Sequence, residues 1–351
     1  MRTKWLLLPL MALSLAGCNN ENKDEGAPYE ISAKNFPDDG FRDYIRAYFD
    51  LDGDGWLSKE ELQNAKQIAI NLDDNNNAAI PFDLSSLKGI EHFENLVYFG
   101  YRYRYMEVLA DEVLDLTKNR SLTFVELICT GDSVRLDLHG LPSLRVLNLG
   151  KIVNSPLAGM DGSPSYDYAD YCRGFYRIDV SDCPSLQEIY LCSKYNSNRH
   201  QYLDASGCVS LKKAEYRNVR ISCAANFAGC KSLESLDFSN DLWMVALDLS
   251  DCEALKEMTL PYSSTTDYDF DVRVIPTNDR FNLDVMPEGF DLSRASNWQG
   301  ARIEGNTLVF TGEIFEDRSG RRIYYCTYDY DTRCPNPAFS KVTVRLGYTN
   351  E

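Results

Sequence analysis

Histidine is scarce in this 351-residue sequence, and the usual catalytic motifs are missing. The three histidines, His92, His139 and His200, lie far apart and belong to no H-E-x-x-H zinc motif. The chain also has no nucleophile elbow, no glycine-rich phosphate loop and no C-x-x-C pair. We therefore expect a protein that is not an enzyme, with a glycosidase-type carboxylate pair assembled in space as the alternative.

Positive charge is scarce as well. Lys and Arg number 36 against 53 Asp and Glu, so the net charge is −17. Such acidity argues against nucleic-acid partners and against electrostatic attraction to anionic lipid surfaces. Hydrophobic residues make up 44% and aromatic residues 12% of the chain, which indicates a folded protein of two or three units.

A long apolar run occurs at the N-terminus, from Trp5 to Leu15, after the basic start MRTK. It predicts a secretory signal peptide over residues 1–17, because the run is too short for a membrane-spanning helix. The run closes on Leu-Ala-Gly-Cys, which resembles a bacterial lipobox. That resemblance implies that Cys18 is lipidated; the alternative is an ordinary signal peptide that ends near a cysteine, or an inert cytosolic start.

The polar and acidic segment NNENKDEGAP follows Cys18 and predicts a flexible tether over residues 18–32. Its Lys-Asp-Glu stretch resembles the acidic export tag of surface lipoproteins in Gram-negative anaerobes. Together these features predict a protein held in the outer membrane by its lipid alone, at the cell surface of a Gram-negative bacterium.

Four of the eleven cysteines recur at a nearly constant interval, with gaps of 25, 22 and 22 residues. Each lies inside a similar segment, so we expect small buried apolar side chains rather than a disulfide framework. These residues are Cys183, Cys208, Cys230 and Cys252. Cys326 and Cys334 flank the segment TYDYDTR, and whether they pair across a hairpin is left open.

One pattern, L-D-x-S-x-C-x-x-L-x-x-L-x-L, recurs through the middle of the chain, as in LDLSDCEALKEMTL from Leu247. The period falls in the leucine-rich-repeat range, and the L-x-L part predicts a short strand with leucine facing inward. Because one strand cannot bury its apolar face alone, stacked coils must share a core. We predict a solenoid over residues 83–266 with an insertion near 151–177. The anchor leucines are Leu122, Leu144, Leu186, Leu211, Leu233 and Leu255.

These repeats make the chain resemble internalin-like leucine-rich-repeat surface lipoproteins. Two further stretches support the resemblance: FPDDGFRDYIRAYFDLDGDGWLSKEEL before the repeats and FDLSRASNWQGARIEGNTLVF after them. The repeats and these two stretches together cover nearly all of the mature chain. The resemblance implies an exported, surface-attached protein.

The stretch FDLDGDGWLSKEEL, residues 49–62, has the spacing of an EF-hand calcium loop. Carboxylates fill positions one, three and five, glycine stands at six, and a glutamate at twelve can bind in bidentate fashion. Apolar spacing predicts a helix on either side, in FRDYIRAYF and in SKEELQNAKQI. The predicted ligands are Asp50, Asp52, Asp54, the Trp56 carbonyl, Ser58 through a water, and Glu61.

A single loop of this kind favours a structural role. Regulatory EF-hands usually come in pairs, and we find no second D-x-D-x-D-G loop. Outside the cell calcium is about millimolar, so a site with a Kd around 10⁻⁴ to 10⁻³ M stays largely filled. We expect Ca²⁺ to fix two short helices into a cap over residues 33–82 that covers the first coil.

Two surfaces are candidates for ligand binding. The insertion is rich in tyrosine, which suits protein or sugar recognition, although a self-packed loop is the alternative. Strand positions between the inward leucines face solvent on the concave side, although a plain solvated face is the alternative. The candidates are Tyr166, Tyr168, Tyr171 and Tyr176 in the insertion, and Glu188, Tyr190, Lys213 and Arg217 on the strands.

Short β-type runs follow the last repeat and predict a small all-β domain over residues 267–351. The expected fold is α+β and mainly β: an EF-hand-type helical cap, a leucine-rich-repeat solenoid and a C-terminal β domain. The expected function is recognition of, or adhesion to, a protein or glycan ligand by a monomer with structural Ca²⁺. The alternative is a glycan-acting enzyme or an accessory subunit of a polysaccharide-utilisation system.

Overall fold

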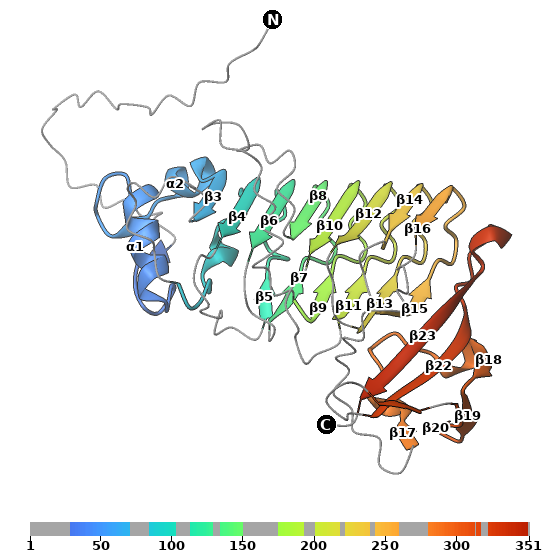
Figure 1. The fold of residues 1–351 in the computed structure, drawn as a ribbon. Helices are drawn as coiled ribbons and strands as arrows, with labels where there is room; N and C mark the ends of the chain where they lie inside the picture. Colours follow the sequence, from blue (N-terminus) through green and yellow to red (C-terminus); the bar gives the residue numbers. More distant parts are fainter. Residues whose placement is uncertain are drawn as a thin grey trace, which may run out of the picture.

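The computed structural model places a helical N-terminal unit, a stack of parallel coils and a C-terminal β unit in that order along the chain (Figure 1). Among the residues it describes, no helix is long and apolar enough to cross a membrane. The described residues are 29–70, 84–102, 113–128, 134–149, 175–192, 201–217, 222–238, 243–259, 280–312, 314–316 and 322–349.

One face of the stack is an eight-stranded parallel sheet built from the L-x-L part of each repeat. Its strand order, from β16 to β3, follows the coils one after another, so each strand pairs with its equivalents in the neighbouring coils. The strands are β3 (Gln67–Ile70), β4 (Tyr98–Arg102), β6 (Phe124–Ile128), β8 (Val146–Leu149), β10 (Glu188–Cys192), β12 (Lys213–Arg217), β14 (Ser235–Asp237) and β16 (Glu257–Thr259).

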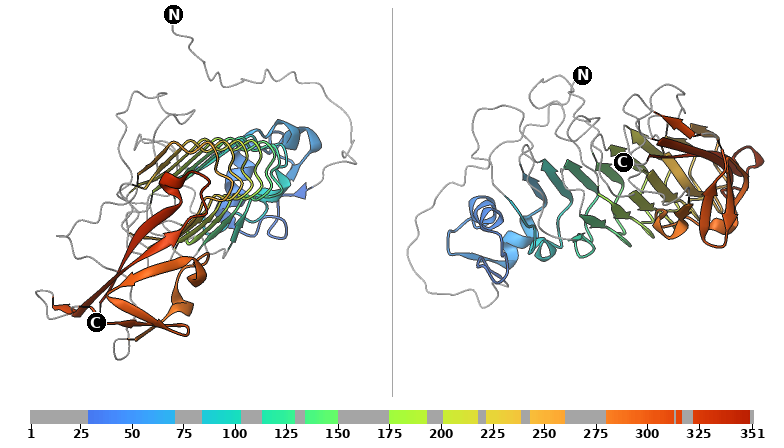
Figure 2. Two further views of the ribbon diagram at one scale, coloured as in Figure 1. Left: turned by 90° about the vertical axis from the view of Figure 1, so that its right-hand side faces the viewer. Right: turned by 60° about the horizontal axis from the view of Figure 1, so that its bottom comes forward.

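The opposite face is a six-stranded parallel sheet that the sequence pattern did not predict. The L-D start of each repeat forms the strands of this second sheet. In each strand the apolar residue before the Asp or Asn points into the core. The solenoid is therefore a two-layer stack, which Figure 2 shows nearly end-on in its left view. The strands are β5 (Val113–Asp115), β7 (Arg135–Asp137), β9 (Arg177–Asp179), β11 (Gln201–Asp204), β13 (Ser222–Asn226) and β15 (Trp243–Asp248).

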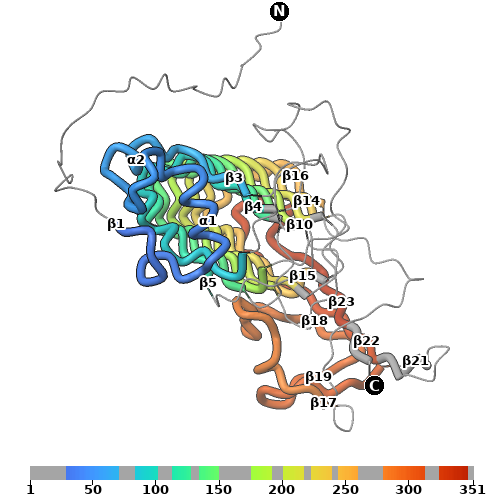
Figure 3. Tube along the Cα trace, turned by 90° about the vertical axis from the view of Figure 1, so that its left-hand side faces the viewer, coloured from blue at the N-terminus to red at the C-terminus, as the bar shows by residue number. Residues whose placement is uncertain are grey.

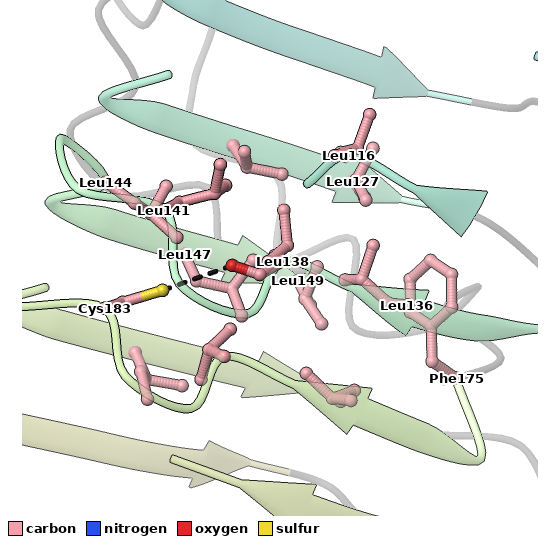
Figure 4. Packing of buried hydrophobic residues seen from close by; sticks show 14 of the residues in the cluster. Leu116, Leu127, Leu136, Leu138, Leu141, Leu144, Leu147, Leu149, Phe175 and Cys183 are labelled. Carbon is pink, nitrogen blue, oxygen red and sulfur yellow. Dashed lines mark hydrogen bonds between the residues drawn. The ribbon is translucent and has the colours of Figure 1, made fainter. Parts of the chain in front are cut away.

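The solenoid core lies between the two sheets. In one coil, Leu136 and Leu138 enter it from the side of β7, and Leu147 and Leu149 enter it from β8 (Figure 4). The six anchor leucines are all buried, with exposed fractions of at most 2%. The sequence pattern thus predicted the repeat core correctly, because its spacing fixes which side chains point inward.

A polar corner follows each strand of the six-stranded sheet. The Asp179 Oδ1 accepts hydrogen bonds from the Ser181 amide at 3.1 Å and from the Ser181 hydroxyl at 2.6 Å. The next residue, Asp182, has a φ of 55°, in the left-handed region. These contacts explain why Asp and Ser recur in the repeat. Asp204 with Ser206 and Asp248 with Ser250 form the same turn.

The repeat cysteines are buried free thiols, one in each of four coils. The Cys183 Sγ donates to the Leu138 carbonyl of the preceding coil at 3.2 Å (Figure 4). Burial raises the pKa of the Cys230 thiol to about 12, so this thiol stays neutral at physiological pH. The prediction of small buried side chains rather than disulfides is confirmed. The equivalent bonds of Cys208, Cys230 and Cys252 measure 3.0, 3.1 and 3.2 Å.

Two helices, α1 (Asp39–Tyr48) and α2 (Lys59–Asn64), lie over the first coil (Figure 3). α1 buries Phe41, Tyr44 and Ile45, and these side chains join the solenoid core. Asp38 ties the helix to the first coil, because its Oδ1 caps the Phe41 amide at 2.7 Å and its Oδ2 accepts from the Ser85 amide at 2.9 Å. The coil continues through the 3-10 helix η1 (Ile90–His92).

The solenoid begins earlier than the repeats predict. β3 (Gln67–Ile70) falls inside the expected cap, in a segment whose spacing predicts a continuing helix. α2 instead ends at Asn64, because Ile68 and Ile70 alternate into the core while β3 pairs in parallel with β4. The expectation of a helix over these residues was wrong, since pairing with the first coil overrides local spacing.

Tyr44 closes the outer edge of β3. Its hydroxyl accepts a hydrogen bond from the Ala69 amide at 3.0 Å and lies 3.3 Å from the Ala69 carbonyl. Burial raises the pKa of Tyr44 to about 12, so the hydroxyl stays protonated. Tyr44→Phe should lower the free energy of unfolding by about 1–2 kcal/mol, because it leaves an edge amide unpaired.

Chemical denaturation measures this change, and Tyr48→Phe in the same helix is the control. Its ring is 53% exposed, so a change within about 0.5 kcal/mol is expected. Equal effects of the two variants would contradict the edge-closing role of Tyr44.

The C-terminal unit contains two antiparallel sheets, close to where short β runs were predicted. It packs against the last strands of the six-stranded sheet, where Tyr202 of β11, Ala224 of β13 and Ala246 of β15 join its core. The first sheet has β17 (Arg280–Asn282), β19 (Ala301–Glu304) and β20 (Thr307–Phe310). The second has β18 (Ala295–Gln299), β21 (Ile314–Glu316), β22 (Arg322–Asp331) and β23 (Lys341–Thr349). The 3-10 helices are η3 (Leu283–Val285), η4 (Leu292–Arg294) and η5 (Pro337–Phe339).

Cys326 and Cys334 are both free thiols, so the disulfide that the sequence left open is not formed. Cys326 lies in the core of the C-terminal unit, whereas Cys334 lies in the core of the solenoid. The two thiols belong to different cores because the chain crosses from one unit to the other between them.

The segment Asp331–Cys334 closes the last coil by imitating the corner of a repeat. The Leu249 amide donates to the Thr332 carbonyl at 2.8 Å, and bonds of 2.8–2.9 Å at this position join the earlier coils to one another. The Asp331 Oδ1 accepts from the Arg333 amide at 2.8 Å, as the Asp of a repeat corner accepts from the amide two residues on. Arg333 has a left-handed φ of 59°, one position earlier than the left-handed residue of the repeats. The segment YDTRCP thus resembles a repeat start, a signal that the sequence analysis missed.

Arg294 connects the two units next to this segment. Its guanidinium donates to the Asp248 carboxylate at 2.7 Å, to the Leu247 carbonyl at 2.9 Å and to the Asp331 carbonyl at 2.8 Å. It also lies over the Tyr330 ring, 4.8 Å from the ring centroid. One buried cation therefore contacts the last repeat strand, β22 and the closing segment at once.

Candidate functional site

The loop between α1 and α2 brings three carboxylates together. Asp50, Asp52 and Asp54 each offer an oxygen, and these oxygens lie within 4.8 Å of one another. The loop can turn this tightly because Gly53 and Gly55 have φ values of 73° and 83°. The three residues are the first three predicted ligands.

Asp50 has a buried oxygen that suits a cation. Its Oδ2 accepts from the Gly55 amide at 3.1 Å, whereas its buried Oδ1 accepts no hydrogen bond from the described residues. Burial raises the pKa of Asp50, and the charges of Glu61 and Asp54 add to the rise against the opposing bonds from the loop amides. A divalent cation would satisfy Oδ1 and relieve this repulsion.

Glu61, the predicted ligand at position twelve, lies beside this cluster. Its carboxylate accepts from the Leu51 amide at 2.6 Å and from the Ser58 amide at 2.8 Å. The Ser58 hydroxyl in turn accepts from the Glu61 amide at 3.2 Å, which makes the capping box that starts α2. The Trp56 amide donates to the Asp54 Oδ1 at 2.7 Å. The six predicted ligands therefore lie in one loop, with Glu61 held in place by the start of its helix.

The loop pairs with a segment of its own chain. β2 (Trp56–Leu57) pairs in antiparallel fashion with β1 (Tyr29–Glu30), with Tyr29 opposite Leu57 and Glu30 opposite Trp56. The Tyr29 ring stacks on His92 with centroids 3.8 Å apart, which fixes β1 against the first coil. The expected tether over residues 18–32 was therefore too long, because its last residues belong to the fold.

The donor set fits calcium. It consists of carboxylate oxygens on a loop that turns at two glycines, and one buried oxygen is left for a ligand. Calcium accepts such hard oxygen ligands in flexible geometry. Asp50, Asp52, Asp54 and Glu61 would hold the ion, with Trp56 and Ser58 at the positions for a carbonyl and a water-mediated contact.

The strand-face candidates lie side by side on the outward face of the eight-stranded sheet. Parallel pairing puts Glu188 opposite Lys213 and Tyr190 opposite Glu215. The Tyr190 hydroxyl donates to the Glu188 carboxylate at 2.5 Å, and the Lys213 ammonium lies 5.8 Å from the centroid of the Tyr190 ring. Lys213 also forms an ion pair with Glu215, which the sequence analysis did not include among the site residues. Glu215 alternates with Lys213 and Arg217 in KAEYR, which places the three on the same face of the sheet.

The four residues Glu188, Tyr190, Lys213 and Glu215, here called the face cluster, combine one ring, one cation and two carboxylates. Glu188, Tyr190 and Lys213 are half-buried, and Glu215 is 4% exposed. A partly exposed ring beside charged groups can stack on an apolar or sugar surface while its neighbours exchange hydrogen bonds. The arrangement is therefore suited to binding.

Of the candidates in the tyrosine-rich insertion, the structure describes one, Tyr176. Tyr166, Tyr168 and Tyr171 lie outside the described residues, as does Cys18. Tyr176 lies just before β9, and its carbonyl accepts from the Tyr202 amide at 2.9 Å. Arg217 ends β12 opposite Cys192, in register with the face cluster.

No protein-family model matches the chain, and no curated protein matches it either. Among solved structures, the chain is similar to one described as the functional domain of InlJ from Listeria monocytogenes, which includes a cysteine ladder. The two share 13% identity over 92% of this chain and 98% of that one, with a TM-score of 0.25. The assignment of this chain as a mainly β repeat solenoid rests on its own strand pairing.

Proposed function

We propose that this chain is a lipid-anchored recognition module that binds a protein or glycan ligand on the outward face of its eight-stranded sheet. The observation that carries the proposal is the face cluster, where Tyr190 contacts both Glu188 and Lys213 on a rigid parallel sheet. Repeat solenoids present such extended surfaces to partners. The lipobox-like LAGC sequence supports an anchor at Cys18, and thereby a place in the outer membrane.

A screen against extracellular host proteins and a glycan array tests this proposal. Once a ligand is found, Tyr190→Ala and Lys213→Ala should each weaken its binding at least about tenfold, because central aromatic and charged residues dominate such interfaces. Lys212→Ala changes an exposed neighbouring residue and should leave affinity within about twofold. Equal losses in all three variants would contradict binding through the face cluster.

The alternative, a glycan-acting enzyme or accessory subunit, gives a different result in the same assays. It requires release of sugars from a bound glycan, and this release must disappear when one carboxylate is replaced. Ligand binding without turnover supports the recognition module.

The calcium loop is proposed to act as a structural clip of the N-terminal cap. At 1 mM Ca²⁺ and a Kd near 10⁻⁴ M, binding should stabilise the fold by about 1.4 kcal/mol, which corresponds to a rise in Tm of roughly 3–6 °C. Glu61→Gln should remove most of this rise, while its amide keeps the capping box that starts α2. Thermal unfolding with Ca²⁺ and with EDTA measures the difference.

Glu60→Gln is the matched control, because Glu60 is exposed and adjacent in the same helix. It should keep the full response to calcium. If EDTA leaves the wild-type melting curve unchanged, bound Ca²⁺ does not stabilise the N-terminal cap and the proposed structural role is contradicted.

A further inference from the structure

The rim of the calcium loop is unusually apolar. Seven large hydrophobic side chains are exposed among the described residues, and three of them lie within nine residues around this loop. Tyr48 ends α1, Leu51 occupies the second position of the loop and Trp56 the seventh. Their exposed fractions are 53%, 76% and 42%. We call these three residues the loop rim.

The chain enters the fold next to the loop rim. β1 pairs with β2 so that Glu30 lies opposite Trp56, and the Tyr29 ring is fixed by its stacking on His92. Eleven residues lead from Cys18 to Tyr29, so a lipid at Cys18 lies at most about 40 Å from this point.

We propose that the loop rim rests on the lipid bilayer in which the chain is anchored, with Leu51 and Trp56 inserted at the level of the headgroups. This inference rests on the lipid anchor and the calcium site of the proposed function. Trp and Tyr favour the membrane–water interface because their rings are apolar with one polar atom. The short tether keeps the rim at high local concentration near the bilayer, so a small apolar contact suffices.

Calcium favours this contact. Asp50, Asp52 and Asp54 lie in the same loop as Leu51 and Trp56 and would repel anionic headgroups. A bound Ca²⁺ would cancel two of the four negative charges that these three aspartates and Glu61 bring to the point of contact. In this orientation the N-terminal cap faces the membrane. The face cluster, on β10 and β12, lies several coils from the cap along the solenoid (Figure 1).

The test uses the full chain, expressed with its own signal in a Gram-negative host and reconstituted in phosphatidylethanolamine–phosphatidylglycerol vesicles. Brominated lipids in these vesicles quench tryptophan that reaches the bilayer. We expect wild-type emission to be quenched in the presence of Ca²⁺, and Trp56→Phe to lose at least about half of that quenching. Trp298→Phe is the matched control, because Trp298 packs on Tyr328 in the C-terminal unit, and it should keep the quenching.

A second pair of variants leaves every tryptophan in place. Leu51→Gln should reduce the quenching, whereas Val209→Gln, at an exposed valine of the solenoid, should not. A chain that carries its lipid and floats with the vesicles but gives equal quenching with and without Trp56 would overturn the inference alone. A mature chain whose mass shows no lipid would remove the proposed anchor, and the inference with it.

Discussion

Replacing Leu211 by Ala is expected to lower the free energy of unfolding by roughly 3 kcal/mol. Leu211 is fully buried at the centre of the stack, between coils that each contribute an equivalent leucine. Truncation removes apolar contacts and leaves a cavity that the rigid two-layer stack can fill only in part. Chemical denaturation followed by far-UV circular dichroism measures the loss.

Val209→Ala in the same coil is the control. Val209 is 44% exposed, so its truncation should change the free energy of unfolding by less than about 0.5 kcal/mol. Similar losses of unfolding free energy at the two positions would mean that burial of the anchor leucines does not dominate the stability of the core.

Replacing Arg294 by Met is expected to cost roughly 3 kcal/mol, the second large effect. Met keeps much of the side-chain volume but leaves the Asp248 carboxylate and the Leu247 and Asp331 carbonyls without their donor. Because these groups belong to both units, the C-terminal unit should become more accessible to proteases before the solenoid unfolds. Limited proteolysis and thermal unfolding report the two effects separately.

Arg302→Met is the control for this variant. Arg302 pairs with Glu304, but its side chain is 60% exposed, so its loss should cost less than about 1 kcal/mol. A wild-type pattern of cleavage in Arg294→Met would contradict its role in joining the units.

The difference in the free energy of unfolding between wild type and Arg294→Met should depend on pH. Burial tends to raise the pKa of Asp248, but hydrogen bonds from Ser250 and the charge of Arg294 outweigh it, so the pKa lies below its usual value. A lowered pKa contributes stability above the unfolded value near 4, and this stability is lost as pH falls through the folded value. The difference in the free energy of unfolding between the two proteins should therefore be largest at neutral pH and should decrease below pH 4.

The repeat core was predictable from the sequence because spacing alone decides which side chains point inward. Leu144 and Cys183 illustrate this, since both are buried as their place in the pattern requires. The three carboxylates of the loop were predictable for a similar reason, because Asp50, Asp52 and Asp54 fill positions one, three and five of the calcium-loop pattern, with Gly55 at position six for the turn.

Contacts between distant segments were not predictable in this way. The pairing of Tyr29–Glu30 with the calcium loop depends on only two residues in each strand, too few to leave a pattern. The closing segment at Thr332 lies far from the repeats in sequence and keeps only part of their pattern. The six-stranded sheet was missed because half of its strands, β5, β7 and β9, have only three residues, which show no clear alternation.

The bond from the Leu249 amide to the Thr332 carbonyl has a consequence for how the array can change in length. It is the bond that any coil offers to the next, so the closing segment recognises the backbone of a corner rather than the identity of a coil. A duplicated or deleted unit of 22 residues in the coils before β9 would shift the C-terminal unit by about 4.8 Å together with the coils on which it packs, and would keep the same acceptor and donor. The two ends of the molecule are in this sense independent of the number of coils between them, and relatives of different length could share both ends.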